Sequence, residues 1–276
     1  LVTHLAHRHA ADPSAHAHIV AAARTEELLR NAAARDAVRA LEREHLLDRI
    51  PVAVFDSTET LALVRALSST RGGNLFGARL QSATGGNPYY LLETIRFLFD
   101  AGELQLDAQG AWATRYDDAT ADYAELPVPP TLAATVMERV ERLGAASRRV
   151  LETAALTSAG FTLAQVQPAT ALSEWEALDG LERAVQAELL ATFAGGYRFV
   201  HDLAREAIAA QLGNERRRLI HDRLAAGLIA QQARADLIAM HLQGAERPAE
   251  AMAWRISAGR DAERLLAWSD ALAQYG

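Results

Sequence analysis

Two short stretches of this sequence combine residue types that can bind an anion. The first is Gly85-Gly86-Asn87-Pro88, which directly precedes an apolar run that begins at Tyr89. Pro88 suits the first turn of a helix, Asn87 can cap the amides of that helix, and the two glycines let the backbone approach another group closely. Unpaired N–H groups and the positive end of the dipole lie at a helix start, so such a turn can seat a nucleotide. The same residues can equally form a turn that only separates two helices.

The second stretch is His201-Asp202, which lies between an expected strand at 197–200 and an apolar helix. An imidazole at a helix start offers an N–H donor that can gain charge beside a phosphate. The alternative is that Asp202 caps the helix and His201 is a half-buried histidine with satisfied nitrogens.

The composition limits the chemistry that the chain can perform. Half of the 276 residues are hydrophobic, which gives room for two or three small domains. All 28 basic residues are arginine, so a GxxxxGK[ST] phosphate-binding loop and a lysine base are both excluded. Cysteine is absent, which excludes disulfides and fits a reducing cytoplasm. With a net charge of −7 and no run of 18 apolar residues, we expect a cytoplasmic protein that does not contact membranes.

Other catalytic patterns give little support to a free-standing enzyme. The sequence has no GxSxG, no HExxH and no convincing pair of carboxylates, so a hydrolase is the least expected class. Five histidines fall within the first eighteen residues, and His4 and His7 are spaced by one helical turn. Because cysteine is absent and Asp12 is the only nearby carboxylate, we expect a surface helix there and no metal site.

The hydrophobic periodicity predicts a mainly α-helical chain with small β elements. We expect buried strands at 18–23 and 49–54, a helix at 31–47 between them, and hairpins at 103–114 and 189–200. A serine or threonine should cap the helix that opens at 56–60, and Thr131 the helix after the 127–130 linker. The remaining helices are expected at 76–83, 89–99, 148–156, from 161, and at 173–187, 203–212, 215–233 and beyond 235.

Several of these stretches resemble one protein family. GGNPYYLLE resembles the GNPF/Y-LLE segment in the lid of the STAND-type ATPases found in large bacterial LuxR/MalT-like transcriptional regulators. PVPPTL…ERVERLGAASRRVLETAAL resembles the start of that family's winged-helix domain, and the His-Asp pair follows the second wing strand as in that family. The tail from 235 to 275 resembles the family's first tetratricopeptide-like (TPR-like) repeats.

The resemblance implies ATP or ADP as the cofactor, with Mg²⁺ in the full-length parent, and it implies roles for four residues. Pro88, next to Asn87, would line the adenine pocket. His201 would touch the β-phosphate of ADP and latch the closed state. Arg24, at the end of the first predicted strand, would be the sensor-1 arginine that reaches the γ-phosphate. Arg24 is about as readily explained as a surface arginine paired with a neighbouring glutamate.

The resemblance also implies a domain organisation. The expected parts are a remnant of an α/β P-loop NTPase core (1–55), a helical lid with a hairpin (56–126), a winged-helix domain (127–212) and a helical linker leading into TPR-like repeats (213–276). The function implied is a nucleotide-dependent regulatory switch, part of a LuxR-family transcriptional regulator. Since the sequence starts at Leu1 and stops at Gly276 within a helical pattern, we expect an internal fragment. Without the phosphate-binding loop and the Mg²⁺ site, this fragment should not hydrolyse ATP alone.

The implied partners are the nucleotide, a small-molecule or protein inducer on the downstream repeats, and a second copy of the chain in the active form. DNA would be bound only by a domain outside this fragment, because the helix at 173–186 carries four acidic residues and one arginine, Arg183. The arginine run at 216–218 is expected to form a solvated face. Two alternatives stay open: the same module attached to a nucleotide cyclase or protein kinase, and a structural scaffold in which the glycine turn and the His-Asp pair only cap helices.

Overall fold

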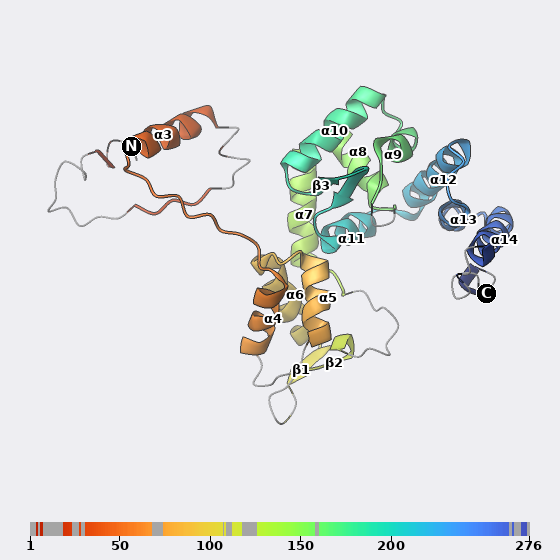
Figure 1. Ribbon diagram of the computed structural model, residues 1–276, viewed down its shortest axis with the longest axis horizontal. Helices are drawn as coiled ribbons and strands as arrows, with labels where there is room; N and C mark the ends of the chain where they lie inside the picture. Colours follow the sequence, from red (N-terminus) through yellow and green to blue (C-terminus); the bar gives the residue numbers. More distant parts are fainter. Residues whose placement is uncertain are drawn as a thin grey trace. The chain divides into compact units, whose positions relative to one another are not determined.

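The computed structural model describes residues 4, 6–7, 19–23, 28, 31–67, 74–106, 108, 112–117, 126–157, 160–264, 267 and 272–274. The chain divides into two compact units, Leu1–Ala53 and Val54–Gly276. Its described residues are mainly helical with two small antiparallel hairpins, which confirms the coarse fold class predicted from the sequence (Figure 1).

The first unit contains helix α3 (Ala32–Arg43), which matches the helix predicted at 31–47. Asn31 caps this helix, since its Oδ1 accepts a hydrogen bond of 3.0 Å from the amide of Ala34. Leu41 is the one residue of α3 that is fully buried. The helix therefore forms through its cap and propensity more than through a large core.

The two strands predicted for this part of the chain are wrong for the residues described. Residues 19–23 and 49–54 have no regular secondary structure. The side chains expected inside a sheet face solvent instead, with Val20 93%, Ile50 83% and Val52 91% exposed. A buried strand needs neighbouring strands to pair its backbone, and the described residues of this unit form none.

The second unit begins with three helices and a hairpin that surround one apolar core (Figure 1). The elements are α4 (Ser57–Ala66), α5 (Asn74–Thr84), α6 (Pro88–Asp100), β1 (Leu104–Leu106), β2 (Trp112–Thr114) and the 3-10 turn η1 (Arg115–Asp117). Each of these elements except β2 contributes residues to the core.

Two aspartates cap helices of this group. Asp56 and Glu59 form a reciprocal capping box at the start of α4, which corrects the predicted serine or threonine cap. Asp117 caps α5 from a distant part of the sequence, because its Oδ1 accepts hydrogen bonds from the amides of Leu75 (3.1 Å) and Phe76 (3.0 Å). The turn after β2 is thereby tied to the start of α5.

A second group of helices with its own hairpin packs around a larger core. Its elements are α7 (Pro130–Arg142), α8 (Ala145–Ala154), α9 (Leu163–Thr170), α10 (Glu174–Gln186), β3 (Leu190–Phe193), β4 (Gly196–Phe199) and α11 (Asp202–Ala210). The apolar face predicted for the first of these helices is confirmed, since Leu132, Val136 and Val140 are all buried.

Thr131 does not cap α7 as predicted. It lies inside the helix, which begins at Pro130 without any side-chain cap. Its hydroxyl donates instead to Glu93 Oε2 over 2.7 Å and so joins α7 to α6.

The order of elements in this group is two helices, a bridging residue, two helices, a hairpin and a final helix. Phe161 follows α8 and pairs with Tyr197 of β4 through two backbone hydrogen bonds of 2.9 and 2.8 Å. β3 and β4 pair antiparallel, as the sequence predicts. The capping box predicted at the start of α10 is also confirmed, with Ser173 and Glu176 bonded reciprocally.

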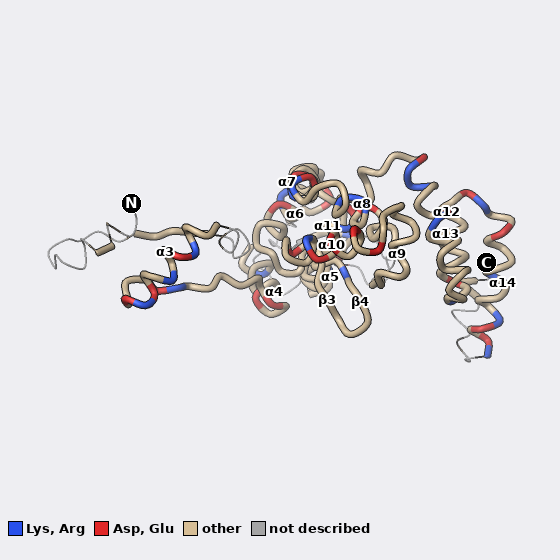
Figure 2. The backbone as a smooth tube through the Cα atoms, turned by 90° about the horizontal axis from the view of Figure 1, so that it is seen from above, with Lys and Arg blue, Asp and Glu red and all other residues tan. Residues whose placement is uncertain are grey.

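The remaining helices, α12 (Asn214–Ala230), α13 (Ala235–Gly244) and α14 (Pro248–Arg264), pack one against the next. Their shared core is small and is built from Ala225, Leu228, Ile238, Leu242 and Ala251. Acidic and basic residues stand side by side along α12 and α14, so neither helix is basic throughout (Figure 2). None of the helices in the described ranges has the length and apolar character needed to cross a membrane.

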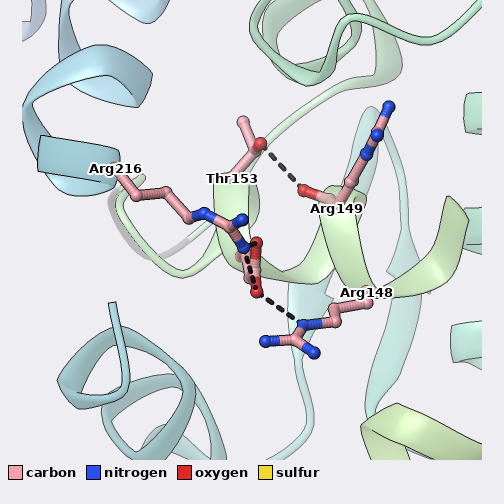
Figure 3. Close-up of polar contacts among 5 residues, drawn as sticks. Arg148, Arg149, Thr153 and Arg216 are labelled. Carbon is pink, nitrogen blue, oxygen red and sulfur yellow. Dashed lines mark hydrogen bonds and ion pairs between the residues drawn. The ribbon is translucent and has the colours of Figure 1, made fainter. Parts of the chain in front are cut away.

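A buried carboxylate joins α12 to the helices before it. The side chain of Glu152 on α8 is 6% exposed and accepts from Arg148 Nε at 2.8 Å and Arg216 Nη1 at 2.9 Å. Figure 3 shows that Arg148 and Arg216 come from separate helices. Arg216 is therefore not part of a simple solvated face, which corrects the expectation for the arginine run. Arg217 also has a structural bond, to the carbonyl of Ala209 over 2.6 Å.

We predict that Glu152→Gln lowers the free energy of unfolding by about 1–3 kcal/mol, because hydrogen bonds to a charged group are lost at a buried position. Both arginines are partly exposed, which keeps the loss toward the lower half of this range. Urea unfolding followed by circular dichroism measures the change. Glu138→Gln is the matched control: Glu138 pairs with Arg142 at 3.0 Å on the surface, and its loss should cost under about 0.5 kcal/mol. Equal effects of the two variants would contradict a structural role for Glu152.

Candidate functional site

The glycine turn before α6 adopts a conformation that only glycine takes readily at two successive positions. Gly85 and Gly86 have φ angles of +58° and +75°. A Cβ on Gly86 would lie 1.9 Å from the carbonyl oxygen of Phe55, and the amide of Phe55 donates to the carbonyl of Gly86 over 2.8 Å. The turn therefore holds the backbone just before α4 in place, in addition to starting α6.

Asn87 and Pro88 act at the start of α6 as the sequence predicts for a helix cap. Pro88 is the first helical residue, and Asn87 Oδ1 accepts from the amides of Tyr89 (3.0 Å) and Tyr90 (3.3 Å). These amides already have a partner. The idea that they are free to hold a phosphate is therefore wrong for this arrangement.

His201 lies directly against the glycine turn, although the two are far apart in the sequence. A Cβ built on Gly85 would be 2.3 Å from His201 Nδ1 and 2.7 Å from Cε1. The imidazole also meets the ring of Tyr90 edge-on, with centroids 5.2 Å apart and the planes at 76°. The structure thus brings three predicted site residues, Asn87, Pro88 and His201, to one place.

The imidazole of His201 is buried and incompletely satisfied. The residue is 8% exposed, and its Nδ1 atom is buried without a hydrogen-bond partner among the described residues. Burial lowers the pKa of His201 to about 4, with the positive charge of Arg139 acting in the same direction and the backbone of Val200 opposing the shift. The side chain is therefore a neutral imidazole at pH 7.

His201 occupies the N-cap position of α11. This position decides only in part between the two interpretations made from the sequence, a phosphate-binding histidine or a satisfied histidine beside an Asp202 cap. Asp202 is the first helical residue, not the cap, and no described side chain caps α11. The prediction that His201 has satisfied nitrogens fails at Nδ1. The start of α11 thus remains a helix terminus without a side-chain cap, next to a buried and unpartnered imidazole.

Two residues of this site were missed by reasoning from the sequence. Tyr90 looks like an ordinary core residue of an apolar helix, yet it packs on His201 and joins the core of the α7–α11 group. Arg139 lies on α7, donates to the carbonyl of Ala187 and acts on His201 through its charge. No spacing pattern links Arg139 to either segment, because three separate helices bring these groups together.

The structure gives less information about the other predicted functional residues. Arg24 and the three histidines at 9, 16 and 18 lie outside the described residues. His7 is paired with Glu44, and no group of three metal-ligating side chains occurs in the described part of the chain.

Comparison of the chain with known protein families, with characterised proteins and with solved structures finds no match. The resemblance to STAND-type ATPases therefore rests on the sequence motifs alone and stays a prediction.

We predict that Gly85→Ala destabilises the protein more than Gly102→Ala does. Gly102 has φ +72° and only an ordinary contact for a built Cβ, with Gln105 Nε2 at 3.9 Å, so alanine there meets little beyond the left-handed backbone penalty of about 1–2 kcal/mol. At Gly85 the methyl group must also displace the His201 ring, which adds about 1–3 kcal/mol. Thermal or urea unfolding measures both changes. Combining Gly85→Ala with His201→Ala should recover part of the loss, and strict additivity would contradict the contact.

We predict that His201 remains neutral well below the ordinary pKa of histidine. Its folded pKa of about 4 lies below the unfolded value of 6.5, so the unfolded chain takes up a proton first as the pH falls. The stability that the neutral ring contributes is complete above pH 6.5 and is lost between 6.5 and about 4. The pH dependence of the imidazole ¹⁵N shifts of His201 measures this directly. A midpoint near 6.5 would show that the ring is not buried against the turn.

Proposed function

We propose that this chain is the lid and winged-helix part of a STAND-type regulatory ATPase, and that its glycine turn and His201 respond to a bound adenine nucleotide. The observation that carries the proposal is the packing of His201 on Gly85. Two motifs that the family resemblance assigns to one nucleotide site, from distant parts of the sequence, meet in space.

The arrangement of elements supports the same proposal. The order α8, the Phe161 bridge, α9, α10 and the β3–β4 hairpin is the order of a winged-helix domain. α4 to α6 with the β1–β2 hairpin correspond to the lid, and the successive packing of α12, α13 and α14 suits the start of a TPR-like array. In this proposal an inducer binds the downstream repeats, and the output, DNA binding by a LuxR-type domain, lies outside these residues.

The residues present fit an adenine nucleotide in some respects. The imidazole of His201 fills the place that a Cβ on Gly85 would take, and its Nδ1 is a donor or acceptor without a partner among the described residues. The positive charge of Arg139 and the uncapped start of α11 favour an anion nearby. Pro88, at the edge of the same turn, would contribute an apolar surface for the adenine ring.

Other features limit what the chain can do with the nucleotide. The amides at the start of α6 are held by Asn87, so the phosphates would have to be held elsewhere. Since the sequence has no lysine, a GxxxxGK[ST] loop is not among these 276 residues, and in this proposal that loop and the Mg²⁺ ligands lie outside them. When bound, Mg²⁺ would neutralise phosphate charge; the residues of the turn and of α11 would position and sense the nucleotide.

The competing proposal is a structural helical scaffold that binds no nucleotide. The complete capping of α6 by Asn87 favours it, because the turn then has a purely structural use. The two proposals differ in their response to ADP. A protein that binds ADP in its folded state gains stability by mass action, about 2.7 kcal/mol when ADP is at 100 times its dissociation constant, whereas a scaffold gains none.

We predict that, in the full-length protein that contains this chain, His201→Ala shortens the retention of ADP by about tenfold, which corresponds to the loss of a hydrogen bond to a charged group. Release of a fluorescent ADP analogue measures the change. His241→Asn is the matched control, because His241 is an equally buried histidine outside the turn, and this variant should retain ADP normally. Unchanged release from the His201 variant would remove His201 from the site, and the absence of ADP binding by the unmodified protein would favour the scaffold.

A further inference from the structure

Two histidines face each other where α12 packs against α13. His221 Nδ1 and His241 Nδ1 are 2.9 Å apart, with ring centroids at 5.1 Å and an angle of 45° between the planes. His241 is 3% exposed. At this distance one nitrogen must carry a proton and donate it to the other, so the pair needs one shared proton to close.

The end of α13 packs closely on the His221 ring. A Cβ built on Gly244, at the end of α13, would lie 2.7 Å from three atoms of the His221 ring. The apolar core shared by α12, α13 and α14 lies along the same helices. If the pair is broken, the helices themselves must move apart.

The charges around the pair do not favour a second proton. Burial and the positive charge of Arg217 lower the pKa of His221, and burial followed by the charge of His221 lowers the pKa of His241 to about 4. The nearby carboxylates on α12, α13, α14 and the connecting turn already pair with arginines. The pairs are Arg247–Asp222, Arg247–Glu250, Arg218–Glu246 and Arg234–Asp236, and the neighbouring helix α9 carries no charged residue.

We propose that His221 and His241 form a proton-sensitive clasp between α12 and α13, closed by one Nδ1–H···Nδ1 hydrogen bond and opened when both rings are protonated. Two protonated rings would place two cations face to face at a buried contact where no carboxylate of the described residues receives them. The folded pKa values lie below that of a free histidine, so the clasp is intact above about pH 6.5 and weakens as the pH falls toward 4. Acidification then loosens α13 and α14 from α12.

Hydrogen exchange on the 276-residue chain at pH 7 and pH 5, expressed as protection relative to an unfolded chain, tests the clasp. The protection of α13 amides should fall by about tenfold between these two pH values. The informative variant replaces both rings, His221→Asn with His241→Asn, because an asparagine amide reaches the position of Nδ1 and does not titrate. This variant should show no selective loss in α13 at pH 5. The control, His201→Asn, removes a buried histidine elsewhere and should behave as the unmodified chain does in α13.

The clasp is overturned if the double variant loses α13 protection as the unmodified chain does. If the double variant does not fold at pH 7, the imidazole ¹⁵N shifts of the unmodified chain decide. The hydrogen bond predicts that the titrations of His221 and His241 are coupled and that both lie below the ordinary value of histidine, whereas independent midpoints near 6.5 contradict it. None of these outcomes depends on nucleotide, so they leave the proposed function to its own test.

Discussion

The close approach of the His201 ring to the α-carbon of Gly85 is the contact on which the arrangement of the second unit depends. It requires a residue without a side chain, at a left-handed φ angle, and a flat ring able to lie against it. Tyr90, in the first turn of α6, closes the other side of the ring. α6 thereby belongs to both cores: Leu91, Ile95 and Leu98 fill the core of the α4–α6 group, while Tyr90 enters the core of the α7–α11 group. Any change in the position of His201 must alter the packing at the boundary between these two cores, which is where a nucleotide-dependent switch would act.

The chain treats its buried polar groups in two different ways. Glu152 is paired with Arg148 and Arg216, and its ion pair with Arg216 joins α8 to α12. The buried histidines are neutral instead, because burial is the main cause that lowers their pKa values. His221 and His241 satisfy each other, whereas His201 Nδ1 has no partner among the described residues. A structural histidine would be expected to resemble the former pair, and the unpaired nitrogen is the feature that sets the turn apart from ordinary packing.

The features that the sequence predicted well depend on neighbouring residues. These features are the Asn87 cap, the capping box of Ser173 and Glu176, and the apolar face of α7. Each arises within a few residues, where helix geometry determines which side chains come into contact. The predicted strands at 18–23 and 49–54 failed because an apolar run gives the tendency to be buried but not the neighbours that bury it. The long-range contacts could not be derived from local pattern. Glu152 with Arg216 and Arg139 near His201 depend on how separate helices pack, and the meeting of His201 with the glycine turn was expected only from the family resemblance.

The most direct test of the contact between His201 and Gly85 is a nuclear Overhauser measurement between the ring protons of His201 and the α-protons of Gly85. The close packing of the two residues predicts a strong cross-peak from the Hε1 proton of His201 to Gly85, accompanied by cross-peaks to the ring of Tyr90. If the ring protons of His201 show cross-peaks only to residues of β4 and α11, the glycine turn and the histidine do not form one site, and the nucleotide-responsive switch proposed for them loses its structural basis.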